Sequence, residues 1–139
     1  KGAVIDANDP RFEKPGAMPE RIATLCKESN QIIPQTPAEY ARCIFDSLAH
    51  AYAKVIAQLQ EASAVNINSI NIVGGGSANK LLNQLTANAT GKTVYTGPIE
   101  ATVLGSIITQ MQASGEVASL EIGRSLIKAS TAQEVYKPQ

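Results

Sequence analysis

Tryptophan is absent from this chain of 139 residues, the aromatic residues make up only 4% of it, and His50 is its one histidine. No serine or cysteine nucleophile is paired with a histidine and an acid in the sequence, so a hydrolytic triad is not predicted. A lone histidine off the apolar face of a helix is typical of a surface or packing residue. The sequence therefore predicts no catalytic constellation of these types.

An excess of charge of one sign is also lacking. Twelve Lys and Arg balance twelve Asp and Glu, and the basic residues are scattered along the chain. Nucleic-acid binding needs a basic patch, so we expect no nucleic-acid partner. No apolar run approaches the roughly 18 residues of a membrane-spanning helix, so we expect no membrane partner either.

Only two cysteines occur, Cys26 and Cys43, and seventeen positions separate them. Zinc sites need about four ligands, usually in pairs two to four residues apart, so no metal site is predicted. Two interpretations stay open: buried free thiols in a cytoplasmic protein, or a disulfide between two predicted helices. A bridge requires that these helices pack antiparallel.

The hydrophobic residues, 44% of the chain, are sufficient for a packed core. The length fits one domain or part of one, and disorder is not expected at this composition. The chain begins Lys1-Gly2-Ala3 without a methionine, and we interpret it as an excised piece of a longer protein.

Several segments have the spacing of amphipathic helices. Residues 19–29 predict a short helix, and the capping box Thr36–Glu39 starts a long one that ends near Ala62. Further helices are expected at residues 100–113 and 120–129, followed by a polar tail. The long helix carries an apolar stripe at helical spacing, formed by Tyr40, Ile44, Leu48, Tyr52, Val55, Ile56 and Leu59. Small residues permit close packing on a second face of this helix, namely Ala41, Ala49, Ala53 and Ala57.

A strand–helix–strand unit with three glycines at its first turn follows the long helix. Ile70–Val73 and Lys92–Thr96 predict its two strands, and Gly91 is placed to end the helix between them. Two strands make a small sheet, so we expect further strands upstream of Lys1. The fold class is α/β. We expect four residues of the helix to face the sheet, namely Leu81, Leu82, Leu85 and Ala89.

The three glycines, Gly74, Gly75 and Gly76, predict a nucleotide or phosphate site. Glycine lacks a Cβ, so a ligand can approach the backbone closely, and the N-terminus of a helix follows. A Walker A motif is excluded, because Asn79 and Leu81 stand at its second glycine and at its hydroxyl position. The dinucleotide fingerprint also fails, because Asn79 replaces its third glycine and no acidic residue ends the second strand.

Two features near the glycines have two interpretations each. The amide of Asn79 can bond an adenine edge or a ribose, or it can bond the first turn of the helix. Ala101 and Gly105 leave a bare patch on a later helix, which fits either close packing or clearance for a ligand. The residues alone leave both pairs of alternatives open.

Three segments in order resemble the FGGY family of carbohydrate kinases. Residues 5–22, IDANDPRFEKPGAMPERI, are similar to the loop and short helix that lead into the C-terminal domain of that family. Residues 38–56 resemble its long helix, and residues 70–105 resemble its adenine-site glycine turn with the elements that follow. The combination of DPRF, CIFDSLA and GGGSANKLLNQL is most similar to the branch that acts on L-rhamnulose.

The resemblance implies that residues 1–139 are part of the C-terminal, nucleotide-binding domain and that the N-terminal domain is absent. It implies a partial actin-like, ribonuclease H-like ATPase fold, a cytoplasmic location, and transfer of the γ-phosphoryl group of ATP, with Mg²⁺, to L-rhamnulose. The implied ATP-binding residues are Gly74, Gly75, Gly76 and Asn79, with Gly75 and Gly76 against the adenosine and Asn79 on the base.

The resemblance also implies that the catalytic aspartate and the sugar contacts lie outside this chain. We therefore expect the isolated 139 residues to be inactive and to bind ATP weakly at best. Cys26 and Cys43 fall on two helices that pack together in this fold, so the disulfide and the free thiols are equally open.

Two alternatives remain beside this hypothesis. One is a kinase of the same family for another sugar, of the xylulose, fuculose or glycerol type. The other is a regulator that keeps the fold without kinase chemistry. A substrate panel separates the sugars, and a catalytic aspartate upstream of Lys1 would exclude the regulator.

Overall fold

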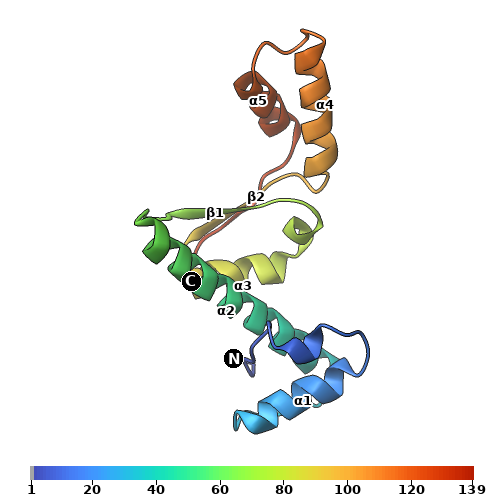
Figure 1. Cartoon of the computed structure of the whole chain (residues 1–139), viewed down its shortest axis with the longest axis vertical. Helices are drawn as coiled ribbons and strands as arrows, with labels where there is room; N and C mark the ends of the chain where they lie inside the picture. Colours follow the sequence, from blue (N-terminus) through green and yellow to red (C-terminus); the bar gives the residue numbers. More distant parts are fainter. Residues whose placement is uncertain (1) are drawn as a thin grey trace.

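The computed structural model describes residues 2–139, which form an elongated mixed α/β molecule with five α-helices and one three-stranded sheet in that range (Figure 1). Helix α1 (Met18–Glu28) lies at one end, and the sheet lies in the middle. Helices α4 (Ala101–Ala113) and α5 (Leu120–Ser130) form the other end. The long helix α2 (Pro37–Ser63) connects the region of α1 with the sheet.

Helix α2 begins where the sequence predicts. Thr36 Oγ1 accepts a hydrogen bond from Glu39 N at 3.3 Å, and the Glu39 carboxylate accepts one from Thr36 N at 3.1 Å. These two bonds complete the predicted capping box. Pro37 occupies the first helical position, where a missing N–H leaves no helical acceptor unpaired.

The buried face of α2 does not follow its apolar stripe. Four members of the stripe are 40–53% exposed, namely Ile44, Tyr52, Val55 and Leu59. The buried positions of α2 are instead small or polar, namely Cys43, Asp46, Ser47 and Ala49. The helix therefore presents much of its apolar surface to solvent.

The N-terminal segment determines which face of α2 is buried. Gly2 N donates to Asp46 Oδ2 at 3.1 Å, and Ile5 N donates to Ser47 Oγ at 3.0 Å. Arg42 lies one turn before Asp46 and pairs with the same carboxylate at 2.9 Å. Backbone groups that leave water need polar partners, so this segment packs along the polar face of the helix.

The predicted strand–helix–strand unit is confirmed. Strands β1 (Ser69–Ile72) and β2 (Thr93–Thr96) are parallel, with Ile70 opposite Val94. Helix α3 (Lys80–Thr90) connects them, and it ends at Gly91, whose φ of 65° is the left-handed conformation that glycine adopts readily. Both strands therefore have their carboxyl ends at the same edge of the sheet.

A third strand, β3 (Val135–Tyr136), pairs antiparallel with β2 on the side away from β1. The sequence predicts only a polar tail there, so that prediction is wrong. The pairing continues outside the strand itself, because Thr96 N donates to Glu134 O and Glu134 N donates to Thr96 Oγ1, both at 2.9 Å. The end of the chain is thus part of the sheet.

Helix α3 buries a different face from the predicted one. Leu81 is 46% exposed, and Leu82, Leu85 and Ala89 are only partly buried. The helix packs against α2 as well as against the sheet, and this second contact rotates its buried face. Its buried residues are Asn83, Thr86 and Ala87.

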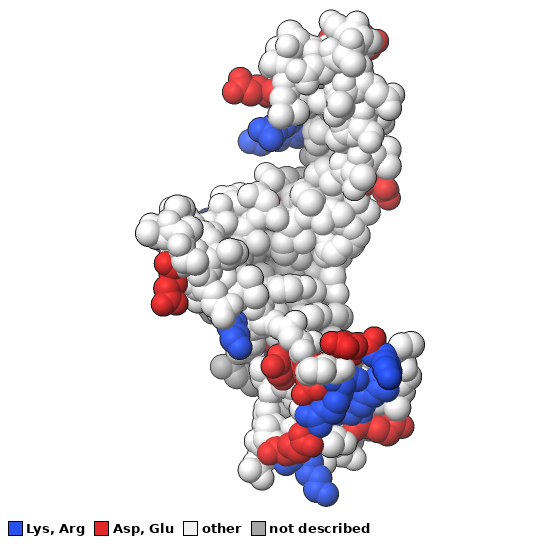
Figure 2. All heavy atoms as spheres, in the orientation of Figure 1, with Lys and Arg blue, Asp and Glu red and all other residues white. Residues whose placement is uncertain are grey.

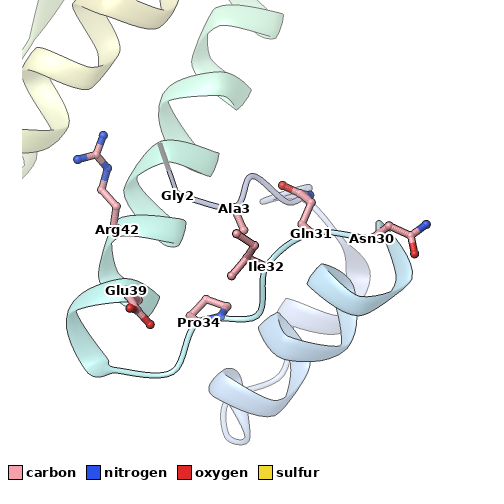
Figure 3. Close-up of a pocket in the computed structure, with 8 residues that line it drawn as sticks. All are labelled: Gly2, Ala3, Asn30, Gln31, Ile32, Pro34, Glu39 and Arg42. Carbon is pink, nitrogen blue, oxygen red and sulfur yellow. The ribbon is translucent and has the colours of Figure 1, made fainter.

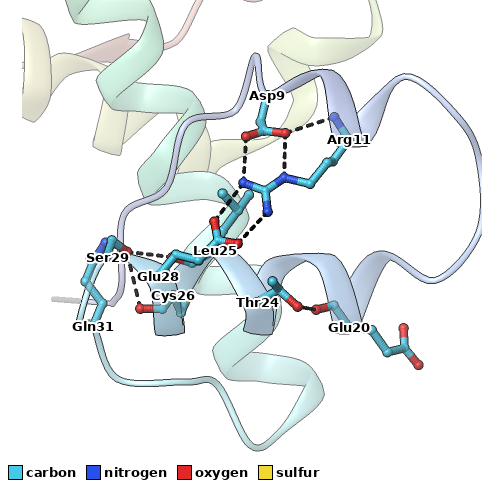
Figure 4. A network of polar contacts seen from close by, with 9 residues as sticks. All are labelled: Asp9, Arg11, Glu20, Thr24, Leu25, Cys26, Glu28, Ser29 and Gln31. Carbon is cyan, nitrogen blue, oxygen red and sulfur yellow. Dashed lines mark hydrogen bonds and ion pairs between the residues drawn. The ribbon is translucent and has the colours of Figure 1, made fainter.

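The loop before α1 is held to that helix by one arginine. Arg11 lies in the short 3₁₀ helix Pro10–Phe12, and its guanidinium pairs with the carboxylates of Asp9 and Glu28, both at 2.9 Å (Figure 4). Arg11 lowers the pKa of both carboxyl groups through these hydrogen bonds. The pairs are exposed, so they orient the loop more than they stabilise the fold.

Helices α4 and α5 pack against each other at a glycine. A Cβ atom at Gly123 of α5 would lie 2.3 Å from Ile108 Cγ2 of α4, so a larger residue at 123 would force the helices apart. Nothing lies within 4 Å of a Cβ placed at Gly105. Close packing does not account for Gly105 within residues 2–139, and clearance for a ligand stays a prediction.

The charged side chains on one face of the molecule gather near α1, and both signs are mixed there (Figure 2). The surface over the sheet and α4 carries few of them on this face. None of the described helices is both long enough and apolar enough to cross a membrane.

Candidate nucleotide-binding site

The glycine turn begins at the carboxyl end of β1 with a residue that must be glycine. Gly74 has φ 80° and ψ −170°, a conformation that is essentially restricted to glycine. A short 3₁₀ helix, Gly75–Ala78, follows before α3 starts at Lys80. The chain therefore reverses direction over the edge of the sheet in these few residues.

The backbone conformations of Gly75 and Gly76 do not require glycine. Neither has a positive φ, both are exposed, and a Cβ at either position would have no atom within 4 Å. Contacts among residues 2–139 therefore do not explain why glycine stands there. A ligand that lies against the backbone does explain it, because a side chain would keep that ligand away.

Asn79 caps α3 with its side chain. Its Oδ1 accepts a hydrogen bond from Leu82 N at 3.0 Å, which is the helix-start bond considered from the sequence. The side-chain nitrogen Nδ2 has no hydrogen-bond partner among residues 2–139. The cap fixes the amide and leaves this donor free, so contact with a nucleotide base stays a prediction that the geometry permits.

Two hydrogen bonds fasten the glycine turn to the turn that follows β2. Gly74 N donates to Pro98 O at 3.0 Å, and Gly97 N donates to Ile72 O at 2.7 Å. A Cβ at Gly97 would lie 2.6 Å from Val73 Cγ1, so the two turns touch. Ligands of open α/β sheets bind beyond the carboxyl ends of the strands, which is where these turns meet.

Lys80, beside Asn79, forms an ion pair with Glu134 of the C-terminal segment at 2.7 Å. The pairing raises the pKa of Lys80 and lowers the pKa of Glu134. Glu134 also accepts a hydrogen bond from the Tyr136 hydroxyl and raises the pKa of that group. The lysine nearest the turn is therefore already paired with a carboxylate.

The described residues bring together no group of three His, Cys, Asp or Glu side chains that could hold a metal ion. The donor set near the glycine turn consists of backbone and amide groups, which suit a nucleoside better than Mg²⁺. Backbone and amide donors of this kind would suit the adenosine part of ATP, and no cluster of three metal-ligating side chains stands beside them in residues 2–139.

A hollow of about 560 Å³ lies near the start of α2, between the N-terminal segment and the connector from α1 (Figure 3). Three of its polar side chains already have partners: Glu39 belongs to the capping box, Arg42 pairs with Asp46, and Gln31 bonds the backbone of Val4. These three groups thus serve the fold, and the hollow is not our candidate site.

Cys26 and Cys43 lie together in the core of the N-terminal part, as two free thiols with no exposed surface. Their nearest companions are Ile22 and the partly buried Phe12 and Tyr40. Both predicted features, burial and proximity, are therefore present. A disulfide between them stays a prediction.

Two polar residues beside the turn were missed from the sequence, Ser77 and Asn83. Both are buried, with 5% and 1% of their surface exposed. One clue was available, since Asn83 follows the cap Asn79 by one helical turn on a helix otherwise rich in leucine. Polar residues at such positions are placed for a hydrogen bond more often than for packing.

Comparison with known proteins identifies the family of this chain. Residues 1–114 match the family described as the FGGY family of carbohydrate kinases, C-terminal domain. The chain is 45% identical over 128 residues to a rhamnulokinase of Oceanobacillus iheyensis, an alignment that covers 92% of this chain and 27% of that protein. It is 44% identical over 135 residues to a rhamnulokinase of Enterobacter sp. (strain 638), covering 97% of this chain and 28% of the relative.

A third rhamnulokinase, from Bacillus subtilis, is 41% identical over 135 residues, again covering 97% of this chain. The chain thus spans only 27–28% of the length of these curated relatives. The match over residues 1–114 includes the glycine turn, β2 and α4. On this evidence the chain belongs to the FGGY family of carbohydrate kinases and matches the C-terminal domain of that family.

Proposed function

We propose that residues 1–139 are part of the nucleotide-binding C-terminal domain of a cytoplasmic rhamnulokinase with an actin-like ATPase fold. The observation that carries this proposal is the open glycine turn, with Gly75 and Gly76 bare toward solvent and the Asn79 amide free beside them. The similarity to rhamnulokinases over more than nine-tenths of the chain supports L-rhamnulose as the sugar.

In this proposal the chain holds one substrate and leaves the chemistry to the rest of the protein. Bound ATP supplies the phosphoryl group, whose bond to the β-phosphate oxygen breaks as a bond to the hydroxyl of L-rhamnulose forms. Gly74, Gly75 and Gly76 lie against the adenosine, and Asn79 Nδ2 donates to the base. Phosphoryl transfer depends on positioning and on electrostatic stabilisation, so holding the nucleotide still is a direct contribution.

The remaining requirements fall outside these residues. A base for the sugar hydroxyl, the sugar contacts and the ligands of Mg²⁺ are assigned to an N-terminal domain of the same protein. The 139 residues alone are then inactive and bind ATP weakly, because only one wall of the site is present.

The test is steady-state kinetics on the full-length protein that contains this chain. We expect ATP-dependent ADP release with L-rhamnulose at a higher kcat/KM than with xylulose, fuculose or glycerol. Asn79→Ala removes the proposed hydrogen bond to the base together with the Oδ1 cap of α3, so it should raise the KM for ATP about tenfold and leave the KM for the sugar unchanged. Asn79→Asp keeps the capping oxygen and removes the donor, so a similar rise there assigns the effect to the contact with the base.

Asn88→Ala is a matched control, because Asn88 lies on the same helix but is exposed and bonds only to Gln84 and Gln139. It should leave the KM for ATP unchanged. Faster turnover of another sugar would show that L-rhamnulose is not the preferred substrate. Absence of turnover with every sugar would favour a regulator without kinase activity.

A further inference from the structure

Asn83 is a buried amide in surroundings that do not require one. Only 1% of its surface is exposed, and it borders a mainly apolar hollow of about 320 Å³ beside Val55, Ile56, Ile72 and Leu82. An aliphatic side chain would fill this space without removing polar atoms from water, a removal that costs roughly 1–3 kcal/mol when a bond is left unmade. The amide therefore calls for an explanation other than packing.

The amide of Asn83 donates a hydrogen bond to the glycine turn, and its side chain also contacts the Tyr136 hydroxyl, on whose pKa it has a lowering effect. Asn83 Nδ2 donates to Ser77 O at 2.9 Å, while Oδ1 is buried and has no partner in the described part of the chain. Exchanging the amide oxygen and nitrogen would place two acceptors opposite each other, so this bond fixes the orientation of the group. Asn83 thus leaves one of its own polar atoms unpaired while it holds Ser77.

Ser77 passes the restraint on to the first glycine. Its backbone N and its Oγ both donate to Gly74 O, at 3.0 and 2.7 Å, and 5% of its surface is exposed. Gly74 N is held in turn by Pro98 O at 3.0 Å. Gly74 and Ser77 are therefore held by hydrogen bonds, one at each end of the short segment that contains Gly75 and Gly76.

Glycines lose more backbone freedom on ordering than other residues do, so a triple-glycine turn binds a ligand weakly unless something else orders it in advance. We propose that Asn83 is a positioning residue, which acts through Ser77 to hold the glycine turn in the conformation that receives ATP. This role rests on the proposed function, because it assigns the turn to nucleotide binding. Asn83 itself does not touch the nucleotide in this proposal.

The test compares three variants of the full-length protein. Asn83→Leu keeps the branched shape and the number of heavy atoms and removes the donor, and Asn83→Asp keeps the shape and places a carboxylate against Ser77 O. Thr86→Val is the matched control, because Thr86 is as deeply buried on the same helix and its hydroxyl bonds only its own helix, at Leu82 O. Thermal midpoints identify any variant that fails to fold. If Asn83→Asp does not fold, the test relies on Asn83→Leu.

We expect both Asn83 variants to raise the KM for ATP about tenfold, with the KM for the sugar unchanged, and Thr86→Val to alter neither. A second measurement is amide hydrogen exchange of residues 74–78 without nucleotide. Exchange there should be faster in Asn83→Leu than in the wild type and unchanged in Thr86→Val.

A folded Asn83→Leu protein with wild-type KM for ATP and wild-type exchange at the turn would overturn the positioning role while the proposed function stood. A wild-type protein that uses no ATP would overturn both. An equal rise in both KM values would also contradict the proposal, because it would indicate general loosening of the domain.

Discussion

The fold changes the chemistry of the Cys43 thiol. Cys43 has no exposed surface, and burial first, then the neighbouring Cys26, raise the pKa of its thiol from 9.0 to about 11. The folded protein holds the neutral thiol more readily than the unfolded chain does. This residue therefore contributes stability that is fully present below pH 9 and is lost as the pH rises from 9 toward 11.

We predict that the Cys43 thiol reacts with an alkylating reagent at pH 8 at least about a hundredfold more slowly in the native protein than in denaturant, because the thiolate is the reactive form. Mass spectrometry over time, on a Cys26→Ser variant under reducing conditions, isolates this thiol. Equal rates in the two states would contradict the burial. Without reductant, the mass of the wild-type protein tests the predicted disulfide.

Residues that act locally were predicted well from the sequence. Gly91 and the capping pair were recognised, and the helix-start bond was one of the two interpretations given for Asn79, because each of these residues acts within three or four positions of itself. Asn83 was missed, because its importance depends on a carbonyl that lies six residues earlier across a turn. Helical spacing alone gives no indication that a buried position holds a hydrogen bond to a loop.

Helix α2 offers a direct test at the scale of elements. Thr36→Ala removes the side-chain acceptor of the capping box, so we predict a loss of about 1 kcal/mol in the free energy of unfolding. Urea unfolding followed by circular dichroism measures this loss. Thr24→Ala is the matched control: Thr24 is exposed inside α1 and its hydroxyl bonds Glu20 O, so the change should cost far less. Similar losses in both variants would reject the cap as the cause.

Element ends and element faces were predicted with different success. The sequence places α1, α2, α4 and α5 within one or two residues of their observed bounds, because caps and glycines mark them. It misplaces the buried face of α3 and does not identify that of α2. Those faces depend on which segment packs there, such as residues 2–5 on α2, and partners more than forty positions away are not encoded in local spacing.

At the scale of the whole molecule, the C-terminal segment joins parts that are far apart in sequence. It pairs with β2 through β3, and its backbone accepts a bond from Gln84 of α3 at Lys137 O. Removal of residues 131–139 should therefore lower the thermal midpoint and, by leaving β2 as an unpaired edge, promote self-association. Calorimetry and light scattering measure the two effects.

Glu134→Gln is the control for that truncation, because it removes the ion pair with Lys80 and leaves the strand pairing intact. That pair is exposed, so the substitution should change the midpoint little and cause no association. A truncated protein that remained monomeric with an unchanged midpoint would show that β3 is dispensable.

The bonds that join Gly74 to Pro98 and Gly97 to Ile72 make one mechanical unit of two turns. Glu100, two residues after Pro98, accepts the first hydrogen bond of α4, from Leu104 N. A ligand that immobilises the glycine turn therefore also immobilises the base on which α4 and α5 stand. Because α4 and α5 pack on each other and follow this turn in the chain, the position of the whole helical pair depends on how firmly the two turns are joined at the sheet.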